Sequence, residues 1–326
     1  MRASRRTFLA AAVAALVVAR GARAQVSRPR KVGFLGGGNA QTDAPGIAAF
    51  HEGMADLGWV HGKDYTLETW YAENVATRLT ALAATVIATR PDVILTTAES
   101  PARALTSQTK IPVVFAIARD PVSTGLAKSL QHPGGTATGL VTFAPELSAK
   151  RVQLLREAFP KTSHVAALYA KDDPVGIVQV SEMERAARGF GMRFTAIGIG
   201  SAADIVPAFA QGEKVGVDGF VVASGVMTST NRKAIVDAAA GVRVPAIYPF
   251  DIFPREGGLL SYGTRRTENY RRAAGYVDKI LKGAAPGELA IEQPTQVDLV
   301  VNQKAARAQG LSISPSLLVR ADMVIQ

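Results

Sequence analysis

The sequence contains no cysteine and only four histidines among its 326 residues. Without cysteine the chain has no disulfide, no zinc–thiolate site, no thiol nucleophile and no lipid-anchoring cysteine behind an export signal. The histidines, His51, His61, His132 and His164, lack the spacing of metal ligands. A Gly-x-Ser-x-Gly nucleophile elbow is also missing. We therefore expect no catalytic residues, no metal site and no cofactor.

Long apolar runs and dense basic runs are scarce as well. Beyond residue 24 no stretch is long and uncharged enough for a membrane span of about 20 residues, so we expect no membrane insertion of the mature chain. That part of the chain carries 32 Lys and Arg residues against 27 Asp and Glu residues, a mild excess spread along its length. Surfaces that bind nucleic acid concentrate basic and aromatic side chains, so we expect no nucleic-acid partner.

The first 24 residues have the pattern of an export signal. Arg5 and Arg6 precede the apolar run 8–18, and residues 22–24 form a small-x-small cleavage site. This pattern predicts cleavage after Ala24 and a periplasmic protein. Residues 4–9 resemble the twin-arginine motif, which implies export in the folded state; an ordinary secretory signal that contains two arginines is the alternative.

From residue 31 onward, strand and helix patterns alternate, which predicts an α/β fold. Each strand candidate of the first half has a mate in the second half that begins 126 to 133 residues later. The pairs are 31–35 with 164–169, 65–71 with 193–199, 92–97 with 218–223, and 111–120 with 244–251. Each half is large enough for its own core, so we expect two similar doubly wound parallel-sheet lobes.

The loops after these strands are the predicted ligand site. In a doubly wound sheet, ligands bind beyond the carboxyl ends of the strands, so two facing lobes form a cleft lined by matched loops. The stretch 111–125 and its mate 244–251 are central, because each is an apolar strand followed by an acidic residue. The candidate ligand-binding residues are Gly38, Asn39, Gln41, Ser100, Arg119, Asp120, Tyr169, Ser224, Phe250 and Asp251.

Four polar residues of this region stand shortly before a proline and predict helix starts: Asp43, Ser100, Asp120 and Asp173. Helix N-termini favour a ligand carboxylate. Asp120 or Asp251 would then accept a hydrogen bond from an ammonium group, so the layout fits a zwitterionic amino acid. Capping of a helix, without any ligand, is the alternative role for Asp120 and Asp173.

Several motifs together resemble one protein family. They are residues 100–102, 111–115, 120–126 and 133–139 in the first half, and residues 257–263, 276–283, 292–295 and 320–325 near the C-terminus. These motifs are similar to those of the substrate-binding proteins of ABC importers in the tryptophan/tyrosine-type family. The resemblance covers nearly all of the mature chain.

The resemblance implies the fold of type I periplasmic binding proteins, whose two lobes are joined by three crossings in a hinge. It implies crossings near residues 143–147, near residues 253–257 and after Gly283. Residues 30–143 with 257–285 would form the first lobe, and residues 144–256 with 286–326 the second. Residues 270–281 would be a helix of the first lobe, because Ala273, Val277 and Ile280 belong to one apolar stripe.

The function implied is a monomeric periplasmic receptor that binds a small molecule and delivers it to the membrane permease of an ABC importer. The chain departs from the family at Arg119, where small or aliphatic residues are common. Its first loop also lacks an aromatic residue, so an aromatic amino acid would have to stack on Phe250 or Tyr169; core packing is the alternative role for both.

A sensor, or a sugar- or small-acid-binding protein, of the same fold is an alternative function. An exported oxidoreductase is disfavoured. The pattern after the first strand has Gln41 where a dinucleotide fingerprint has its third glycine, and no acidic residue follows at the expected distance.

Overall fold

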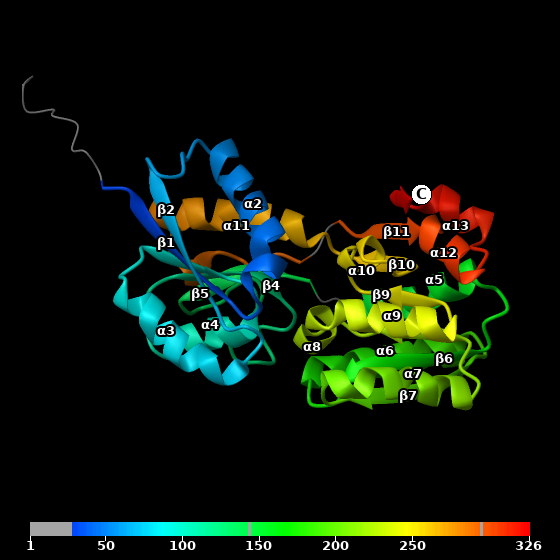
Figure 1. Ribbon diagram of the computed structural model, residues 1–326. Helices are drawn as coiled ribbons and strands as arrows, with labels where there is room; N and C mark the ends of the chain where they lie inside the picture. The colour runs from blue at the N-terminus through cyan, green and yellow to red at the C-terminus, as the bar shows by residue number, and fades with distance from the viewer. Residues whose placement is uncertain (1–27, 143–144, 294–295) are drawn as a thin grey trace, which may run out of the picture.

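A computed structural model describes residues 28–142, 145–293 and 296–326, and it contains two α/β lobes (Figure 1). The predicted export signal lies outside these residues. The first lobe is built on a five-stranded sheet of order β2-β1-β3-β4-β5. The second is built on a seven-stranded sheet of order β12-β11-β10-β9-β8-β6-β7. Both predicted parallel-sheet lobes are therefore confirmed.

The first lobe alternates strands with helices on both faces of its sheet. One face packs on α2 and α11, and the other packs on α3 and α4. Its elements are β1 (Arg30–Gly36), α2 (Ala40–Asp56), β2 (Tyr65–Tyr71), η1 (Ala76–Arg78), α3 (Leu79–Ala88), β3 (Val93–Thr96), α4 (Glu99–Thr106), β4 (Val113–Ala118), β5 (Ala137–Val141), α11 (Arg266–Leu281) and η3 (Pro286–Glu288).

The second lobe repeats this plan and adds two strands at one edge. One face of its sheet packs on α5, α6, α12 and α13, and the other packs on α7, α9 and α10. Its elements are α5 (Pro145–Ala158), β6 (His164–Ala170), α6 (Pro174–Gly189), β7 (Arg193–Ile199), η2 (Ala202–Asp204), α7 (Ile205–Lys214), β8 (Gly219–Val222), α8 (Val226–Thr230), α9 (Arg232–Val242), β9 (Ala246–Tyr248), α10 (Ile252–Arg255), β10 (Leu260–Gly263), β11 (Asp298–Asn302), α12 (Gln303–Gln309), α13 (Pro315–Arg320) and β12 (Met323–Ile325).

The internal repeat predicted from the sequence is present in the strand order. The strands β2-β1-β3-β4-β5 of the first sheet correspond in position to β7-β6-β8-β9-β10 of the second. Thus β4, the strand of the central stretch 111–125, has β9 as its counterpart. All neighbouring pairs in the shared five-strand pattern are parallel, whereas β11 is antiparallel to β10.

Two of the three expected crossings lie elsewhere in the structure. Because β10 pairs with β9 and β11, residues 257–263 belong to the second lobe, and the second crossing is at Thr264 and Arg265. Residues 286–292 stay with the first lobe, since Leu140 bridges Glu292 and Ile291 packs in a first-lobe core. The third crossing therefore follows residue 292. The first crossing joins β5 to α5, and it includes residues 143–144, which lie outside the described residues.

Three of the four predicted helix starts are wrong in detail. Helix α2 begins at Ala40, where Asn39 is the cap and accepts a hydrogen bond from Thr42 N at 2.9 Å, so Asp43 lies inside the first turn. Helix α4 begins at Glu99, one residue before Ser100. Asp120 opens a turn instead of a helix. Asp173 caps α6 as predicted, with Pro174 in the first turn.

Helices α2 and α11 are far apart in sequence and lie against each other in the first lobe (Figure 1). Two glycines of α2 permit this approach. A Cβ on Gly46 would lie 2.6 Å from the ring of Tyr270, and a Cβ on Gly53 would lie 2.3 Å from the backbone oxygen of Arg271. The close packing brings the first turns of the two helices together. None of the helices in the described part of the chain has the length and apolar character needed to cross a bilayer.

Candidate functional site

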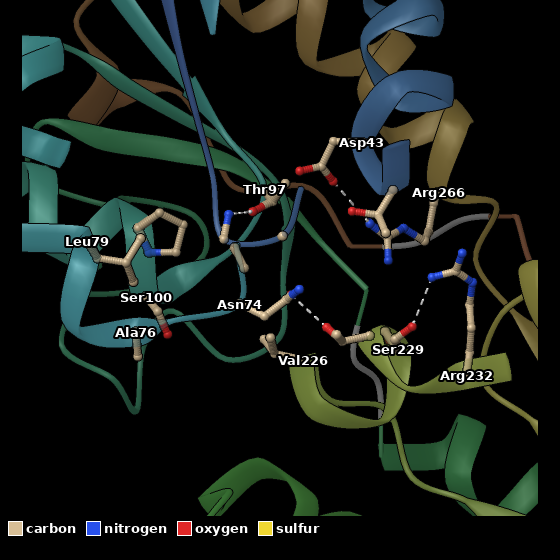
Figure 2. Close-up of a pocket in the computed structure, with 16 residues that line it drawn as sticks. Asp43, Asn74, Ala76, Leu79, Thr97, Ser100, Val226, Ser229, Arg232 and Arg266 are labelled. Carbon is tan, nitrogen blue, oxygen red and sulfur yellow. Dashed lines mark hydrogen bonds and ion pairs between the residues drawn. The ribbon is translucent and has the colours of Figure 1, made fainter. Parts of the chain in front are cut away.

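A cavity of about 200 Å³ lies between the two lobes (Figure 2). The first lobe contributes the loops after β1 and β3 and the starts of α2, α3 and α4, and the second lobe contributes α8 and the start of α9. Its lining residues are Gly37, Gly38, Thr42, Asp43, Asn74, Ala76, Leu79, Thr97, Ala98, Ser100, Pro101, Val226, Ser229, Thr230, Arg232 and Arg266. The cavity therefore lies beyond the carboxyl ends of the strands, where the sequence predicts it.

Asp43 is a buried carboxylate at this cavity. It is 2% exposed, and its Oδ2 atom has no hydrogen-bond partner among the described residues. Its Oδ1 atom lies 3.8 Å from Nη2 of Arg266, which is longer than a hydrogen bond. Burial raises the pKa of the Asp43 carboxyl to about 6, and the positive charge of Arg266 offsets this only in part. Asp43 is thus a buried carboxylate in the wall of the cavity, with Arg266 and the hydroxyl of Tyr270 beside it.

The start of helix α4 offers hydrogen-bond donors to the same cavity. Its N-cap residue Ala98 has no side chain that can cap the helix. The N–H groups of Glu99 and Ser100 are first-turn groups without an acceptor inside the helix, and the helix dipole adds partial positive charge there. The hydroxyl of Ser100, an exposed residue that lines the cavity, is a further donor. This end of the cavity suits a carboxylate.

A second cavity of about 520 Å³ adjoins the first on the side of the crossings. Thr42, Arg232 and Arg266 line both cavities. Arg232, on α9 of the second lobe, donates to Glu256 Oε1 at 2.7 Å and to Ser229 O at 3.2 Å. Arg266 begins α11 of the first lobe. Two guanidinium groups from opposite lobes therefore stand where the cavities meet.

A third, smaller cavity of about 70 Å³ also lies between the lobes and shares Thr97, Val226 and Arg266 with the first. Arg119 is one of its lining residues. The Arg119 guanidinium makes an ion pair with Asp173 at 2.5 Å and donates to Ser224 O at 3.3 Å, so it joins the first lobe to the second. Thr230 Oγ1 donates to Asn74 Oδ1 at 2.7 Å in a further contact between the lobes.

Glu99 holds the loop that carries Arg119. It is 6% exposed, and its Oε1 atom accepts hydrogen bonds from the backbone N–H groups of Arg119 and Asp120. Because a carboxylate that accepts backbone N–H groups makes charge-assisted bonds, Glu99 fixes the direction in which Arg119 leaves strand β4.

We expect Glu99→Ala to lower the free energy of unfolding by about 2–3 kcal/mol, because two N–H groups near the protein interior lose their acceptor. Glu99→Gln keeps an acceptor oxygen and should cost about 1 kcal/mol. Urea unfolding of both variants and of the parent measures whether Glu99→Ala loses more free energy of unfolding than Glu99→Gln. Glu182→Gln, at an exposed pair with Arg185, is the control and should stay near the parent. Equal stability of Glu99→Ala and the parent would show that Glu99 does not hold this loop.

The structure places seven of the ten candidate ligand-binding residues at the inter-lobe cavities. Gly38 and Ser100 line the first cavity, and Arg119, Ser224 and Phe250 line the third. Gln41 and Asp251 line only the second cavity, where Asp251 is paired with Arg255 at 2.9 Å. Gln41 and Asp251 therefore lie at the second cavity, whereas Gly38 lies at the first. Which of these residues contact a ligand stays a prediction.

The other three candidates have structural roles in the described part of the chain. Asn39 caps α2. Asp120 accepts a hydrogen bond from Ser123 N at 3.0 Å within its own turn. Tyr169 packs against a core of the second lobe. Arg119 and Asp120 are neighbours in the chain, but Arg119 pairs with Asp173 of the second lobe and Asp120 closes a turn.

Sequence reasoning missed Asp43 as a cleft residue, and it missed Asn74, Thr97, Arg232 and Arg266 altogether. Thr97 ends the predicted strand 92–97, and Asp43 comes after the predicted strand 31–35. Because ligands bind beyond the carboxyl ends of the strands in such a sheet, these positions could have been included among the candidates. Arg232 and Arg266 start helices α9 and α11, whose places at the cleft depend on the crossings. The described residues contain no group of three or more His, Cys, Asp or Glu that could hold a metal ion.

We expect Arg119→Met to weaken closure of the lobes. The Arg119–Asp173 pair joins the two lobes and its side chains are only 19% and 14% exposed, so its loss should shift the equilibrium toward an open form by about 1 kcal/mol. Small-angle scattering of the ligand-free protein should then give a larger radius of gyration. Arg188→Met, which removes an exposed pair with Glu184 within α6, should leave the radius unchanged. A radius equal to the parent's would contradict a closing role for Arg119.

Comparison with known proteins agrees with this architecture. A family model described as ABC transporter substrate binding protein matches residues 44–325. A tyrosine-binding protein of Clostridioides difficile strain R20291 is 22% identical over 279 residues, which cover 84% of this chain and 79% of that protein.

Solved structures share the fold of the chain. An ABC domain from Streptococcus pneumonia in complex with L-Trp is 22% identical, with a TM-score of 0.83, over 91% of this chain and 100% of that one. The ligand-free, open structure of a substrate binding protein with adhesive properties from Clostridium difficile is 20% identical, with a TM-score of 0.71, over 91% of this chain and 99% of that one.

Proposed function

The chain belongs to the family of ABC transporter substrate-binding proteins, and we propose that it is the exported receptor of an ABC importer that binds an amino acid between its two lobes. Proteins of this family are substrate-binding receptors that act outside the cytoplasm. For this chain we propose a periplasmic location after cleavage at Ala24, and no catalytic activity. The cavity is complete within one chain, which supports action as a monomer.

The observation that carries the proposal is the separation of charge in the first cavity. Asp43 contributes a buried carboxylate whose Oδ2 atom meets no hydrogen-bond partner by distance and angle among the described residues, and the start of α4 offers N–H groups and the hydroxyl of Ser100. A zwitterionic amino acid presents an ammonium group and a carboxylate a short distance apart. We place its ammonium group at Asp43 and its α-carboxylate at the start of α4.

The names of related proteins support the same class of ligand. One curated relative is a tyrosine-binding protein, and one solved relative holds L-Trp. Both ligands carry the same α-ammonium and α-carboxylate groups. We therefore propose that this chain recognises the same α-ammonium and α-carboxylate groups as those proteins. The proposal does not extend to the side chain of the ligand.

The mechanism we propose is a shift between open and closed forms. A ligand that contacts both lobes stabilises the closed form by its additional contacts there, and the importer's permease then recognises that form. The crossing at Thr264 and Arg265 belongs to the proposed hinge, because it joins β10 of the second sheet to α11 of the first lobe.

A panel of ligands tests the function. An amino acid at about 100 times its dissociation constant should raise the free energy of unfolding by about 2.7 kcal/mol. Thermal and urea unfolding of the mature protein should be measured with the common amino acids, small organic acids and sugars. A response to sugars alone would assign the alternative function, and no response to any amino acid would overturn the proposal. Rapid consumption of NADH would overturn the receptor function itself.

A further inference from the structure

The first and third inter-lobe cavities offer a ligand no free aromatic face among the described residues. The first cavity is lined by no aromatic residue among those described, and Phe250 is the aromatic residue that lines the third. Phe250 is 6% exposed, and the guanidinium carbon of Arg266 lies 5.8 Å from the centre of its ring. The cation therefore occupies the ring face on which an indole or phenol would stack. The first and third cavities therefore give the side chain of an aromatic ligand no free ring on which to stack in the described chain.

Three arginines line these cavities instead. Arg119, Arg232 and Arg266 line the first and third cavities, and each has an acidic partner, Asp173, Glu256 and Asp43 respectively, of which Asp43 lines the first cavity in the described chain. Figure 2 shows Arg232 and Arg266 on the same side of the first cavity, with the start of α4 on the opposite side. A ligand whose α-carboxylate lies at α4 thus has its far end directed toward two guanidinium groups.

These two guanidinium groups retain capacity for an anion. Arg232 forms an ion pair with Glu256 Oε1 through Nε and Nη2, both at 2.7 Å, and donates from Nη1 to Ser229 O. A guanidinium has five N–H donors, so two of them are left for an anion. Arg266 approaches Asp43 only to 3.8 Å, so this ion pair is not a hydrogen bond. Because both arginines also line the second cavity, they stand at a position that a ligand's outer end can reach from the first.

We propose that the ligand is an acidic amino acid whose side-chain carboxylate binds between Arg232 and Arg266. This inference rests on the proposed function and specifies its substrate class. Arg232 belongs to the second lobe and Arg266 to the first. A carboxylate between them joins the lobes by charge-assisted bonds that the open form lacks, and so the acidic side chain drives closure.

Isothermal titration of the mature protein with L-glutamate, L-aspartate, L-glutamine, L-leucine, L-tryptophan and glutarate tests the proposal. L-Glutamate or L-aspartate should bind about 10- to 100-fold more tightly than L-glutamine, L-leucine or L-tryptophan. Tighter binding of a neutral amino acid would overturn the inference and leave the proposed function intact. Equal binding of glutarate and L-glutamate would overturn both, since glutarate has no ammonium group. Absence of binding by every amino acid would also overturn both.

A variant separates the role of Arg232 from folding. Arg232→Gln should weaken L-glutamate binding about 10-fold or more and change L-glutamine binding little, because the uncharged ligand makes no ion pair there. Binding of L-glutamine in the variant also reports that the cleft is folded. Arg188→Gln, which removes an exposed pair with Glu184 outside the cleft, should leave both affinities unchanged. Equal losses for the two ligands in Arg232→Gln would overturn the proposal.

Discussion

Replacing Asp43 with asparagine should stabilise the ligand-free protein and abolish tight binding of amino acids. Burial raises the pKa of Asp43 to about 6, so its proton is held more tightly in the folded state than in the unfolded state. Above pH 6 the folded state must carry a buried charge, which lowers its stability. We expect Asp43→Asn to gain about 2 kcal/mol at pH 8, since each pKa unit corresponds to about 1.4 kcal/mol and Arg266 loses its counterion.

The pH dependence identifies the cause. Below the ordinary carboxyl pKa the side chain is protonated in both states, so the advantage of Asp43→Asn should nearly disappear at pH 3.5. It should grow as the pH rises from 4 through 6 and then level off. Urea unfolding of both proteins across this range measures the difference. A difference that does not change with pH would show that the charge of Asp43 is not its source.

The same substitution should weaken ligand binding about 100-fold at pH 8, because an amide cannot pair with an ammonium group as a carboxylate does. In the parent, affinity should fall as the pH drops below 6 and Asp43 takes up its proton. Asp56→Asn is the matched control on the same helix, because Asp56 forms an ion pair with Arg271 and is 56% exposed. Asp56→Asn should change the free energy of unfolding and the ligand affinity much less than Asp43→Asn does. Unchanged binding in Asp43→Asn would remove Asp43 from the site.

The repeat in the sequence predicted much of the fold. Alternating patterns located the strands around 31–35 and 164–169 and their mates, and the structure arranges both halves in the same strand order. The error at the second crossing had a local cause. Residues 257–263 resemble a family motif, which does not show that 260–263 form a strand, although β10 has the same place in its lobe as β5. Because β10 belongs to the second sheet, the chain can cross to the first lobe only after residue 263.

The candidate site was less predictable, because burial and partners come from distant segments. Nothing near Asp43 in the sequence shows that Arg266 and Tyr270 lie against it, since α11 follows more than two hundred residues later. Tyr169 shows the opposite case: it ends a strand at the cleft side, yet its ring packs on a core. The strand-end rule locates a region, and the direction of each side chain depends on packing that a single sequence does not record.

The position of Arg266 depends on how closely α11 approaches α2, and Gly53 controls that approach. A Cβ at Gly53 would lie 2.3 Å from the backbone oxygen of Arg271 and 2.9 Å from Cβ of Ala274. Because the nearest atom belongs to the backbone of another helix, no side-chain rotation relieves the contact. Gly53→Ala should therefore push α11 away from α2 and lower the free energy of unfolding by about 3 kcal/mol.

Gly275→Ala is the matched control within α11, because a Cβ there meets no atom within 4 Å. In a helix interior alanine is favoured over glycine, so this variant should gain about 0.5–1 kcal/mol. Displacement of α11 also separates Arg266 from Asp43, so Gly53→Ala should weaken ligand binding as well, while Gly275→Ala should bind like the parent. Urea unfolding and isothermal titration of the two variants measure both effects. A Gly53→Ala protein as stable as Gly275→Ala would show that the two helices can separate without cost, and that their contact does not position the site.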